Sequence, residues 1–290
     1  MTRPGIAFQG EFGANSDEAC REHFPDHEPT PCPTFEDAFE AVRSGACALG
    51  LIPVENSIAG RVGDVHHLLP ESGLRIIGER FKPIRFQLMA NAGTAIGDLR
   101  LVASHVMALG QCRKAIRELG LRTEIASDTA GAAKALSEHP DRTRAAIAPA
   151  LAADLYGLEI LRRDIEDAHH NTTRFLVMTA DRDPPRPPPG VDCVTSFVFR
   201  VRNVPAALYK AMGGFATNGV NMTKLESYMD GGVFTATVFY ADVEGRPEDR
   251  NVTLALEELG FFSERIEILG VYPADPFRRS SAQLPGGEPD

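Results

Sequence analysis

The chain has 290 residues, of which 43% are hydrophobic and 24% are charged; this composition excludes a disordered chain, and the length predicts about two domains. Lys and Arg number 30 against 40 Asp and Glu, and the net charge of −10 argues against a nucleic-acid binder, which needs a basic face. No stretch approaches the roughly 20 apolar residues of a membrane helix, and the N-terminus lacks the apolar segment of a signal peptide, so we expect a cytoplasmic protein without a membrane partner.

Short strands alternate with helices over the first 180 residues. Apolar runs predict strands at Gly5–Phe8, Cys47–Val54, Leu74–Gly78, Ile84–Ala90, Leu101–Ala103, Thr123–Ala126, Ala145–Ala148 and Arg174–Thr179. Helix signals predict a helix to about Phe24 with Asn15 and Glu18 at capping-box spacing, one behind Thr34 as N-cap, and helices over Val106–Leu119 and Thr129–Glu138. Two such series predict an α/β architecture of two lobes, with a ligand cleft at the carboxyl ends of the strands.

A proline-rich segment divides the chain. Residues 181–190 (DRDPPRPPPG) contain five prolines in ten residues, which predicts a stiff spacer outside helix and sheet. We therefore expect one domain over 1–180, a linker over 181–190, a second domain over 191–277 and a flexible polar tail over 278–290.

The second domain is predicted to follow the order βαββαβ, a ferredoxin-like unit of about 80 residues. Strands are predicted at Val194–Val201, Asn221–Tyr228, Val233–Val243 and Arg265–Tyr272, and apolar residues at helical spacing surround Ala211 and Ala255. Asn218-Gly219 predicts a left-handed helix end, and Asp230-Gly231-Gly232 predicts a hairpin turn.

Four polar clusters adjoin predicted strands, where a cleft between two lobes would lie. They are Pro53–Gly60 (PVENSIAG), Ser104-His105 with Gln111-Cys112, Ser127–Ala130 (SDTA) and Asn171–Phe175 (NTTRF). The first three also have an ordinary interpretation, because such residues are typical of turns and helix N-caps. In the fourth, Arg174 suits bidentate binding of a carboxylate and equally suits a surface ion pair on an edge strand.

Other motifs argue against metal and nucleotide sites. The five cysteines are odd in number and form no CxxC pair, so we expect reduced structural thiols. The histidines of the pairs His66-His67 and His169-His170 are adjacent, which is a poor spacing for metal ligands. No P-loop and no GxSxG motif is present.

Taken together, the four clusters in this order, followed by a βαββαβ unit, resemble the prephenate dehydratase family with a C-terminal ACT domain. Residues 53–57 (PVENS) are similar to the family's P-I-E-N-S, and residues 171–175 to its N-x-T-R-F. The resemblance implies an α/β fold: a two-lobed catalytic domain like a type II periplasmic binding protein, then a ferredoxin-like ACT domain that pairs across a homodimer or homotetramer. It implies no cofactor and no metal.

The implied reaction converts prephenate to phenylpyruvate, CO₂ and water. Aromatisation supplies driving force, so a hydrogen-bond donor at the departing hydroxyl and a site that orients the dianion are sufficient. By resemblance, Thr173 is that donor, Arg174 faces a carboxylate, and Glu55 and Asn56 complete the catalytic set. The substrate-binding residues implied in the same way are Ser16, Ser57, Ser104, Gln111, Ser127, Thr129, Thr172 and Phe175.

The ACT unit implies an amino-acid effector, which in the family is L-phenylalanine. The residues expected at this allosteric site are Ala207, Leu208, Asn218, Gly219, Val220, Asn221, Met222, Glu226 and Ser227. The chain departs from the family at four places, one of them Val106-Met107, where the family has the P-Q of S-H-P-Q-A-L. Ala206 replaces the glycine of a G-A-L element, Tyr228-Met229 replace the end of E-S-R-P, and Ala14 replaces the threonine of G-P-x-G-T-F-S.

Two other functions fit the same residues. Arogenate, which carries an amino group in place of the keto oxygen of prephenate, is an alternative substrate. A two-lobed binding module joined to an amino-acid sensor, acting without catalysis, is the alternative from a different class.

Overall fold

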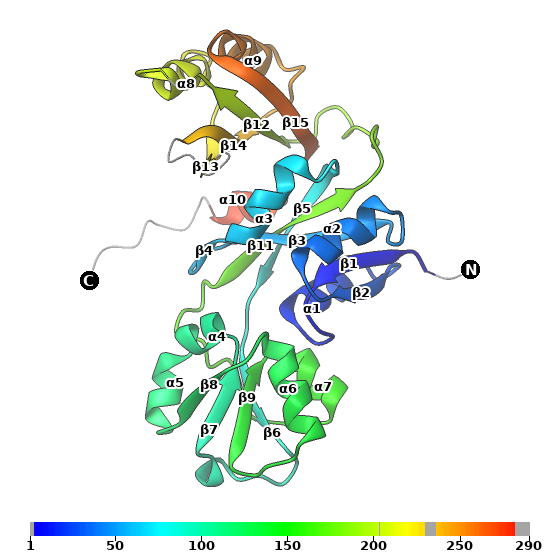
Figure 1. Ribbon diagram of the computed structural model, residues 1–290, viewed down its shortest axis with the longest axis vertical. Helices are drawn as coiled ribbons and strands as arrows, with labels where there is room; N and C mark the ends of the chain where they lie inside the picture. Colours follow the sequence, from blue (N-terminus) through cyan, green and yellow to red (C-terminus); the bar gives the residue numbers. More distant parts are fainter. Residues whose placement is uncertain (1–2, 203, 230–235, 282–290) are drawn as a thin grey trace. The chain divides into compact units, whose positions relative to one another are not determined.

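The computed structural model describes residues 3–202, 204–229 and 236–281. The chain divides into two compact units, one made of Met1–His66 and Arg80–Leu176 and the other of His67–Glu79 and Val177–Asp290. The described residues form three sheets (Figure 1). No helix among the described residues is long and apolar enough to cross a membrane.

The first sheet has the strand order β2-β1-β3-β11-β5, with β4 paired to β3. Its strands are β1 (Gly5–Gln9), β2 (Glu28–Cys32), β3 (Leu49–Asn56), β4 (Gly60–Arg61), β5 (Arg75–Pro83) and β11 (Thr172–Thr179), with helices α1 (Asn15–His23), α2 (Phe35–Arg43) and α3 (Gly63–Leu68) and the short turn η1 (Leu69–Glu71). β2 is absent from the predicted strands because it contains two prolines. It is tolerated as a strand because it lies at the edge of the sheet, where a missing N–H costs nothing.

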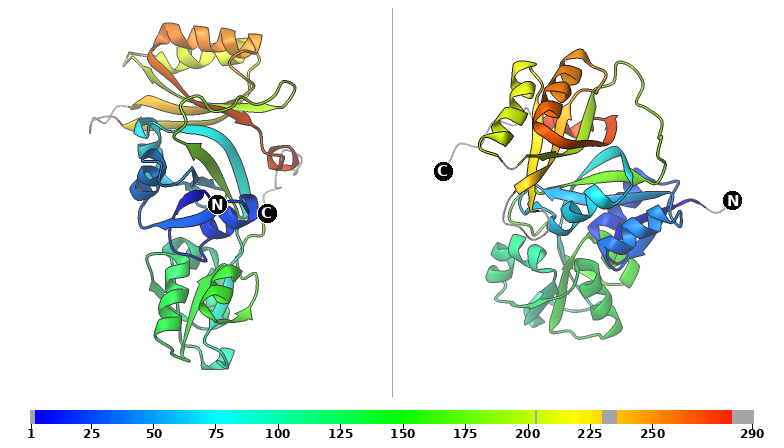
Figure 2. Two further views of the ribbon diagram at one scale, coloured as in Figure 1. Left: turned by 90° about the vertical axis from the view of Figure 1, so that its right-hand side faces the viewer. Right: turned by 45° about the horizontal axis from the view of Figure 1, so that its top comes forward.

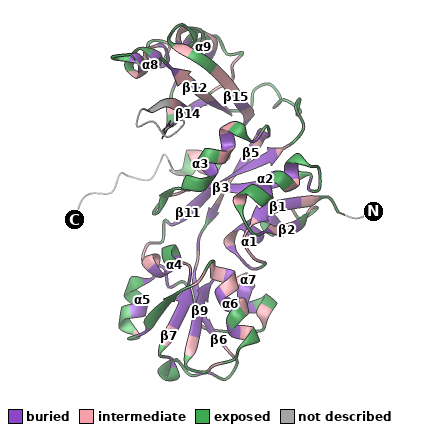
Figure 3. Ribbon diagram, in the orientation of Figure 1, coloured by how far each residue is buried: buried purple, intermediate pink, exposed green. Residues whose placement is uncertain are grey.

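The second sheet has the order β10-β6-β9-β7-β8 and forms the other lobe of the first unit. Its elements are β6 (Gln87–Ala90), η2 (Ile96–Asp98), β7 (Leu101–Ser104), α4 (Val106–Gln111), α5 (Arg113–Glu118), β8 (Arg122–Ile125), α6 (Thr129–Glu138), β9 (Arg144–Ala148), α7 (Ala150–Tyr156) and β10 (Glu159–Arg162). The predicted two-lobed α/β architecture is therefore confirmed. The central strands β9 and β11 of the two sheets are largely buried (Figure 3).

The third sheet has the order β13-β14-β12-β15, which is the ferredoxin-like arrangement that the βαββαβ pattern predicts. Its elements are β12 (Cys193–Val201), α8 (Ala207–Thr217), β13 (Met222–Met229), β14 (Ala236–Glu244), α9 (Arg250–Phe262) and β15 (Ser263–Pro273), followed by α10 (Phe277–Ser281). Both views of Figure 2 place α8 and α9 on one face of this sheet. Gly219 has φ +64°, as the predicted helix end requires. The predicted turn at 230–232 lies outside the described residues.

Two predicted helix features are wrong. Asn15 does not cap α1: Ala14 is the N-cap residue, without a side-chain hydrogen bond, and Asn15 is the first helical residue. The predicted helix Val106–Leu119 is two helices that break at Cys112. The carboxylate of Asp167 causes this break, because it accepts hydrogen bonds from the backbone N–H groups of Arg113 and Lys114 and so caps a new helix start.

The tail predicted over 278–290 begins with a helix, because α10 occupies Phe277–Ser281. Arg278 anchors this helix through hydrogen bonds to the carboxylate of Glu79 at 2.6 and 2.9 Å. The five cysteines are free and buried, as structural thiols are expected to be.

Candidate functional site

Hydrogen bonds join three segments of the first unit: the end of β3, the segment that enters β11 and carries Thr173, and the end of α4. Backbone hydrogen bonds fix the first two segments together. The N–H of Ser57 donates to the Thr172 carbonyl at 2.9 Å, and the Thr172 N–H donates to the Ser57 hydroxyl oxygen at 3.0 Å. The Ser57 hydroxyl in turn donates to the carbonyl of His170 at 2.8 Å. Ser57 and Thr172 therefore hold the backbone that presents Thr173.

Asn56 positions the hydroxyl of Thr173. Its Nδ2 donates to Thr173 Oγ1 at 2.9 Å, while its Oδ1 accepts from the backbone N–H groups of Ile58 and Ala59 at 3.0 and 2.8 Å. Because Thr173 Oγ1 accepts this hydrogen bond, its own hydrogen is left to be donated elsewhere. The fold therefore brings together Asn56 and Thr173, two residues that the sequence predicts at the site.

Asn171 is a central residue that was not among the predicted site residues. It is 1% exposed, accepts from Asn56 Nδ2 at 2.8 Å and donates from its own Nδ2 to Gln111 Oε1 at 3.0 Å. The signal that could have found it was present, since Asn171 is the first residue of the NTTRF motif. The predicted residue Gln111 is joined to the site through this contact.

The remaining members of these two segments differ in exposure. Arg174 is buried and has partners within the protein, and Glu55, half-buried, lies opposite Arg61 in the β3–β4 ladder. Both side chains therefore have interactions within the protein. Phe175 is 1% exposed and packs in the core, so its side chain supports β11.

The other predicted residues lie outside this hydrogen-bonded cluster in the described part of the chain. Ser104 is fully buried and its hydroxyl donates to the Ile147 carbonyl at 2.6 Å, so it could offer a ligand only its lone pairs. Ser16 is buried in the first turn of α1, and Thr129 begins α6 behind the cap residue Asp128. Ser127 is exposed.

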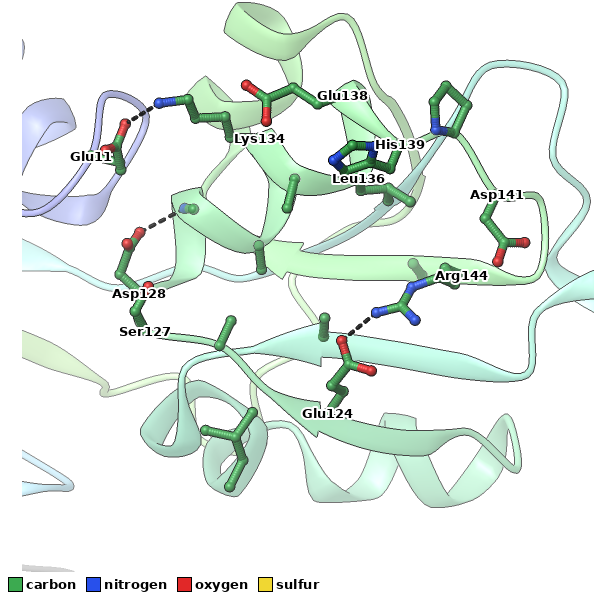
Figure 4. Close-up of a pocket in the computed structure, with 18 residues that line it drawn as sticks. Glu11, Glu124, Ser127, Asp128, Lys134, Leu136, Glu138, His139, Asp141 and Arg144 are labelled. Atoms are coloured by element: carbon green, nitrogen blue, oxygen red, sulfur yellow. Dashed lines mark hydrogen bonds and ion pairs between the residues drawn. The ribbon is translucent and has the colours of Figure 1, made fainter.

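A hollow of about 950 Å³ lies beside α6 and β8, away from Thr173 (Figure 4). Its walls include Ser127, Asp128 and two ion pairs, Lys134 with Glu11 and Arg144 with Glu124. Its lining does not include Thr173, Asn56 or Gln111. This hollow and the hydrogen-bonded cluster around Asn56 and Thr173 are therefore separate features of the first unit.

The two lobes of the first unit also meet at the loop after β1. Tyr156 Oη donates to the Phe12 carbonyl at 2.7 Å, and Ala14 packs in an apolar cluster with alanines of α6 and α7. A Cβ on Gly13 would lie 2.9 Å from the Cα of Ala152. Gly13, with φ +87°, thus permits a close approach between the lobes, and Ala14 fills an apolar contact.

We expect Gly13→Ala to destabilise the protein by more than the roughly 1–2 kcal/mol of a left-handed alanine, because its methyl group meets backbone of the opposite lobe. The matched control is Gly120→Ala, which also has a positive φ but has open space around its Cβ position. Chemical denaturation measures both. An equal loss of unfolding free energy in the two variants would show that stability does not depend on the close contact between Gly13 and Ala152.

The described residues offer neither a reactive thiol nor a metal site here. Burial, aided by the nearby carboxylates of Asp167 and Glu166, raises the pKa of the Cys112 thiol, so it stays protonated and unreactive. No group of three His, Cys, Asp or Glu among the described residues is arranged to hold a metal. The cluster can orient an anion and donate hydrogen bonds.

The predicted effector residues lie in the second unit, at both ends of α8 and along β13. Asn218 donates to the Gly214 carbonyl at 2.8 Å and to Glu258 Oε1 at 3.1 Å, and Lys224 pairs with Glu226 at 3.2 Å. Ser227 is exposed, whereas Ala207 and Val220 are buried. Leu208 follows Ala207 in the first turn of α8, and Gly219, Asn221 and Met222 complete the turn into β13. The 11 residues of α8 separate the two groups by about 16 Å.

Ala206, at the N-cap of α8, has φ +61°, a left-handed conformation that favours glycine. We expect Ala206→Gly to stabilise the protein by about 1 kcal/mol, because it removes the contact between Cβ and the following carbonyl. Thermal unfolding should show a small rise in Tm. A fall in Tm would mean that the alanine is not strained.

Comparisons with known proteins place the chain in a family. The family model described as prephenate dehydratase matches residues 6–183. A protein of Komagataeibacter europaeus named bifunctional N-acyl-homoserine lactone acylase/prephenate dehydratase is 53% identical, covering 94% of this chain and 97% of that protein. Arogenate dehydratase/prephenate dehydratase 2 of Arabidopsis thaliana is 38% identical, covering 94% and 74%. A crystal structure of prephenate dehydratase from Arthrobacter aurescens in complex with L-Phe has 30% identity and a TM-score of 0.84, covering 96% of each chain.

Proposed function

This chain belongs to the prephenate dehydratase family, and we propose that the Thr173 cluster converts prephenate to phenylpyruvate, CO₂ and water in the biosynthesis of phenylalanine. The observation that carries the proposal is the hydrogen bond from Asn56 to Thr173 Oγ1, which leaves the hydroxyl hydrogen available at a site rich in donors. No cofactor is needed for this chemistry.

The mechanism is a decarboxylation coupled to loss of the ring hydroxyl. The bond from the ring to its carboxylate breaks and releases CO₂, and its electron pair moves through the ring as the C–O bond breaks. Thr173 donates its proton to the departing oxygen, which leaves as water, and the threonine regains a proton from solvent. Proton donation in step with bond cleavage suits a hydroxyl, which is a weak acid on its own.

The other residues bind and orient the dianion in this proposal. Gln111 and Asn56 donate hydrogen bonds, Arg174 supplies positive charge, and Glu55 orients its neighbours. Ser16, Ser127 and Thr129 are further proposed substrate-binding residues. Ser104, whose hydroxyl hydrogen is donated to the Ile147 carbonyl, is proposed to contact the substrate only as a hydrogen-bond acceptor. The proposed enzyme keeps the predicted domains, a catalytic domain over 1–180 and an ACT domain over 191–277, and the predicted cytoplasmic location.

We further propose that L-phenylalanine regulates the enzyme at the ACT domain of a homodimer or homotetramer. The Arthrobacter relative, whose structure is a complex with L-Phe, supports the ligand. The separation of about 16 Å along α8 supports the oligomer, because one amino acid cannot touch both groups of effector residues in one chain. Calorimetric titration with L-phenylalanine that showed no heat and no change of activity would overturn this proposal.

A second candidate activity is hydrolysis of N-acyl-homoserine lactones. The 53% identity to the Komagataeibacter protein, whose name includes this activity, favours it. The buried Cys112 thiol does not supply a nucleophile for it. Arogenate is an alternative substrate for the dehydratase reaction, favoured by the name of the Arabidopsis relative.

The test compares the rates of the purified chain on prephenate, arogenate and an N-acyl-homoserine lactone under one set of conditions. We expect the highest kcat/KM with prephenate, measured by the absorbance of phenylpyruvate. Faster formation of phenylalanine from arogenate would reassign the substrate. Release of homoserine lactone without phenylpyruvate would replace the proposal by the acylase.

A further inference from the structure

Three side-chain amides at the proposed site form a closed ring. Asn56 Nδ2 donates to Asn171 Oδ1 at 2.8 Å, Asn171 Nδ2 donates to Gln111 Oε1 at 3.0 Å, and Gln111 Nε2 faces Asn56 Oδ1 at 3.5 Å. Asn56 and Asn171 belong to the lobe of the first sheet, whereas Gln111 ends α4 in the other lobe. The ring therefore joins the two lobes beside Thr173.

The backbone sets the direction of this ring. Asn56 Oδ1 accepts from two backbone N–H groups, at Ile58 and Ala59, so its Nδ2 must point toward Asn171. Asn171 then presents Oδ1 to Asn56, and its Nδ2 must point toward Gln111. An amide has one donor end and one acceptor end, so Gln111 turns Oε1 toward Asn171. Its Nε2 carries two hydrogens: one faces Asn56 Oδ1 in the long 3.5 Å contact, and the second can be donated to an acceptor outside the ring.

We propose that Asn171 is a positioning residue that fixes the orientation of the Gln111 amide, so that Gln111 presents N–H donors to an anionic carboxylate of the substrate. This inference rests on the proposed function, because the benefit of a donor end depends on a dianionic substrate. A Gln111 amide turned the other way would place its oxygen against that anion.

The variants Asn171→Asp and Asn171→Ala distinguish orientation from simple space filling. In Asn171→Asp the carboxylate still accepts from Asn56 but attracts Nε2 of Gln111, which turns its oxygen outward. We expect kcat/KM to fall by about 100-fold, mostly through KM, with a smaller loss in Asn171→Ala, where Gln111 is free to turn either way. A structural role would give the opposite order, because Asp is nearly isosteric with Asn.

A double-mutant cycle separates orientation from direct repulsion of the substrate by the new carboxylate. In a Gln111→Ala background, Asn171→Asp should cost only a few-fold more, because the amide that it misorients is gone. An undiminished cost in that background would overturn the proposal. The matched control is Asn91→Asp, at a half-buried asparagine that also donates to a carbonyl, that of Leu136, and we expect it to retain wild-type kinetics.

A measurement without turnover tests the ring independently of the proposed function. In NMR spectra of labelled protein, the side-chain NH₂ signals of Gln111, assigned with Gln111→Ala, should shift in Asn171→Asp and stay unchanged in Asn91→Asp. Unmoved Gln111 signals in Asn171→Asp would overturn the ring. An active wild type with unaffected Asn171 variants refutes the positioning role alone, whereas a folded wild type that leaves prephenate unchanged refutes the proposed function.

Discussion

Replacing Thr173 with alanine is expected to lower kcat for prephenate by about 10²–10⁴-fold, the usual contribution of a positioned proton donor. The hydroxyl accepts from Asn56 at 2.9 Å, and in the proposed mechanism its hydrogen is donated to the departing oxygen. Because Gln111 and Arg174 remain, KM should change much less than kcat. Steady-state kinetics on prephenate, with thermal unfolding to confirm the fold, measures both quantities.

Two further substitutions at this position sharpen the test. Thr173→Ser keeps the hydroxyl and should retain most of kcat, whereas Thr173→Val keeps the shape and should behave as the alanine variant does. Retention of most of kcat in Thr173→Val would remove Thr173 from the mechanism.

Replacing Arg278 with alanine is expected to destabilise the protein by about 3–5 kcal/mol, the cost of removing one member of a buried ion pair. The side chain of Glu79 is 0% exposed and binds Arg278 through both Nε and Nη2, while its Oε1 also accepts from the backbone N–H of Asp275. This pair ties α10 to β5 within the second unit. Chemical denaturation gives the change in the free energy of unfolding.

The neighbouring Arg279 provides the matched control. It lies on the same helix and pairs with Asp192, but both side chains are exposed, so Arg279→Ala should cost less than about 1 kcal/mol. Glu79→Gln, which removes the buried charge and keeps a hydrogen-bonding group, should cost less than Arg278→Ala. If Arg278→Ala and Arg279→Ala were equally mild, the buried pair would not stabilise the fold.

Local signals predicted most of the elements. The helix-start signal and apolar spacing of α6 predicted both of its ends, Thr129 and Glu138. The ferredoxin-like order of the third sheet was predicted from the succession of four strand patterns and two helix patterns. Thr34 caps α2 through a full capping box with Asp37, as its residue type suggests. Such features depend on residues within one or two turns of each other.

The features that escaped prediction depend on residues far apart in the chain. The break between α4 and α5 comes from Asp167, more than 50 residues away, and β2 is a strand only because it lies at a sheet edge. The role of Asn171 needs the fold, because its partners Asn56 and Gln111 come from different lobes. The family resemblance pointed to the segments of Asn56, Gln111 and Thr173, which the fold brings together, but hydrogen-bond direction within them is a property of the folded chain.

The most direct test of the central claim is the initial rate of phenylpyruvate formation from prephenate by the wild-type chain and by Thr173→Ala at saturating substrate. We predict rapid formation of phenylpyruvate with one CO₂ per product in the wild type, and a loss of at least about 100-fold in the variant. A folded wild type that forms no phenylpyruvate, or a variant as fast as the wild type, would contradict the account.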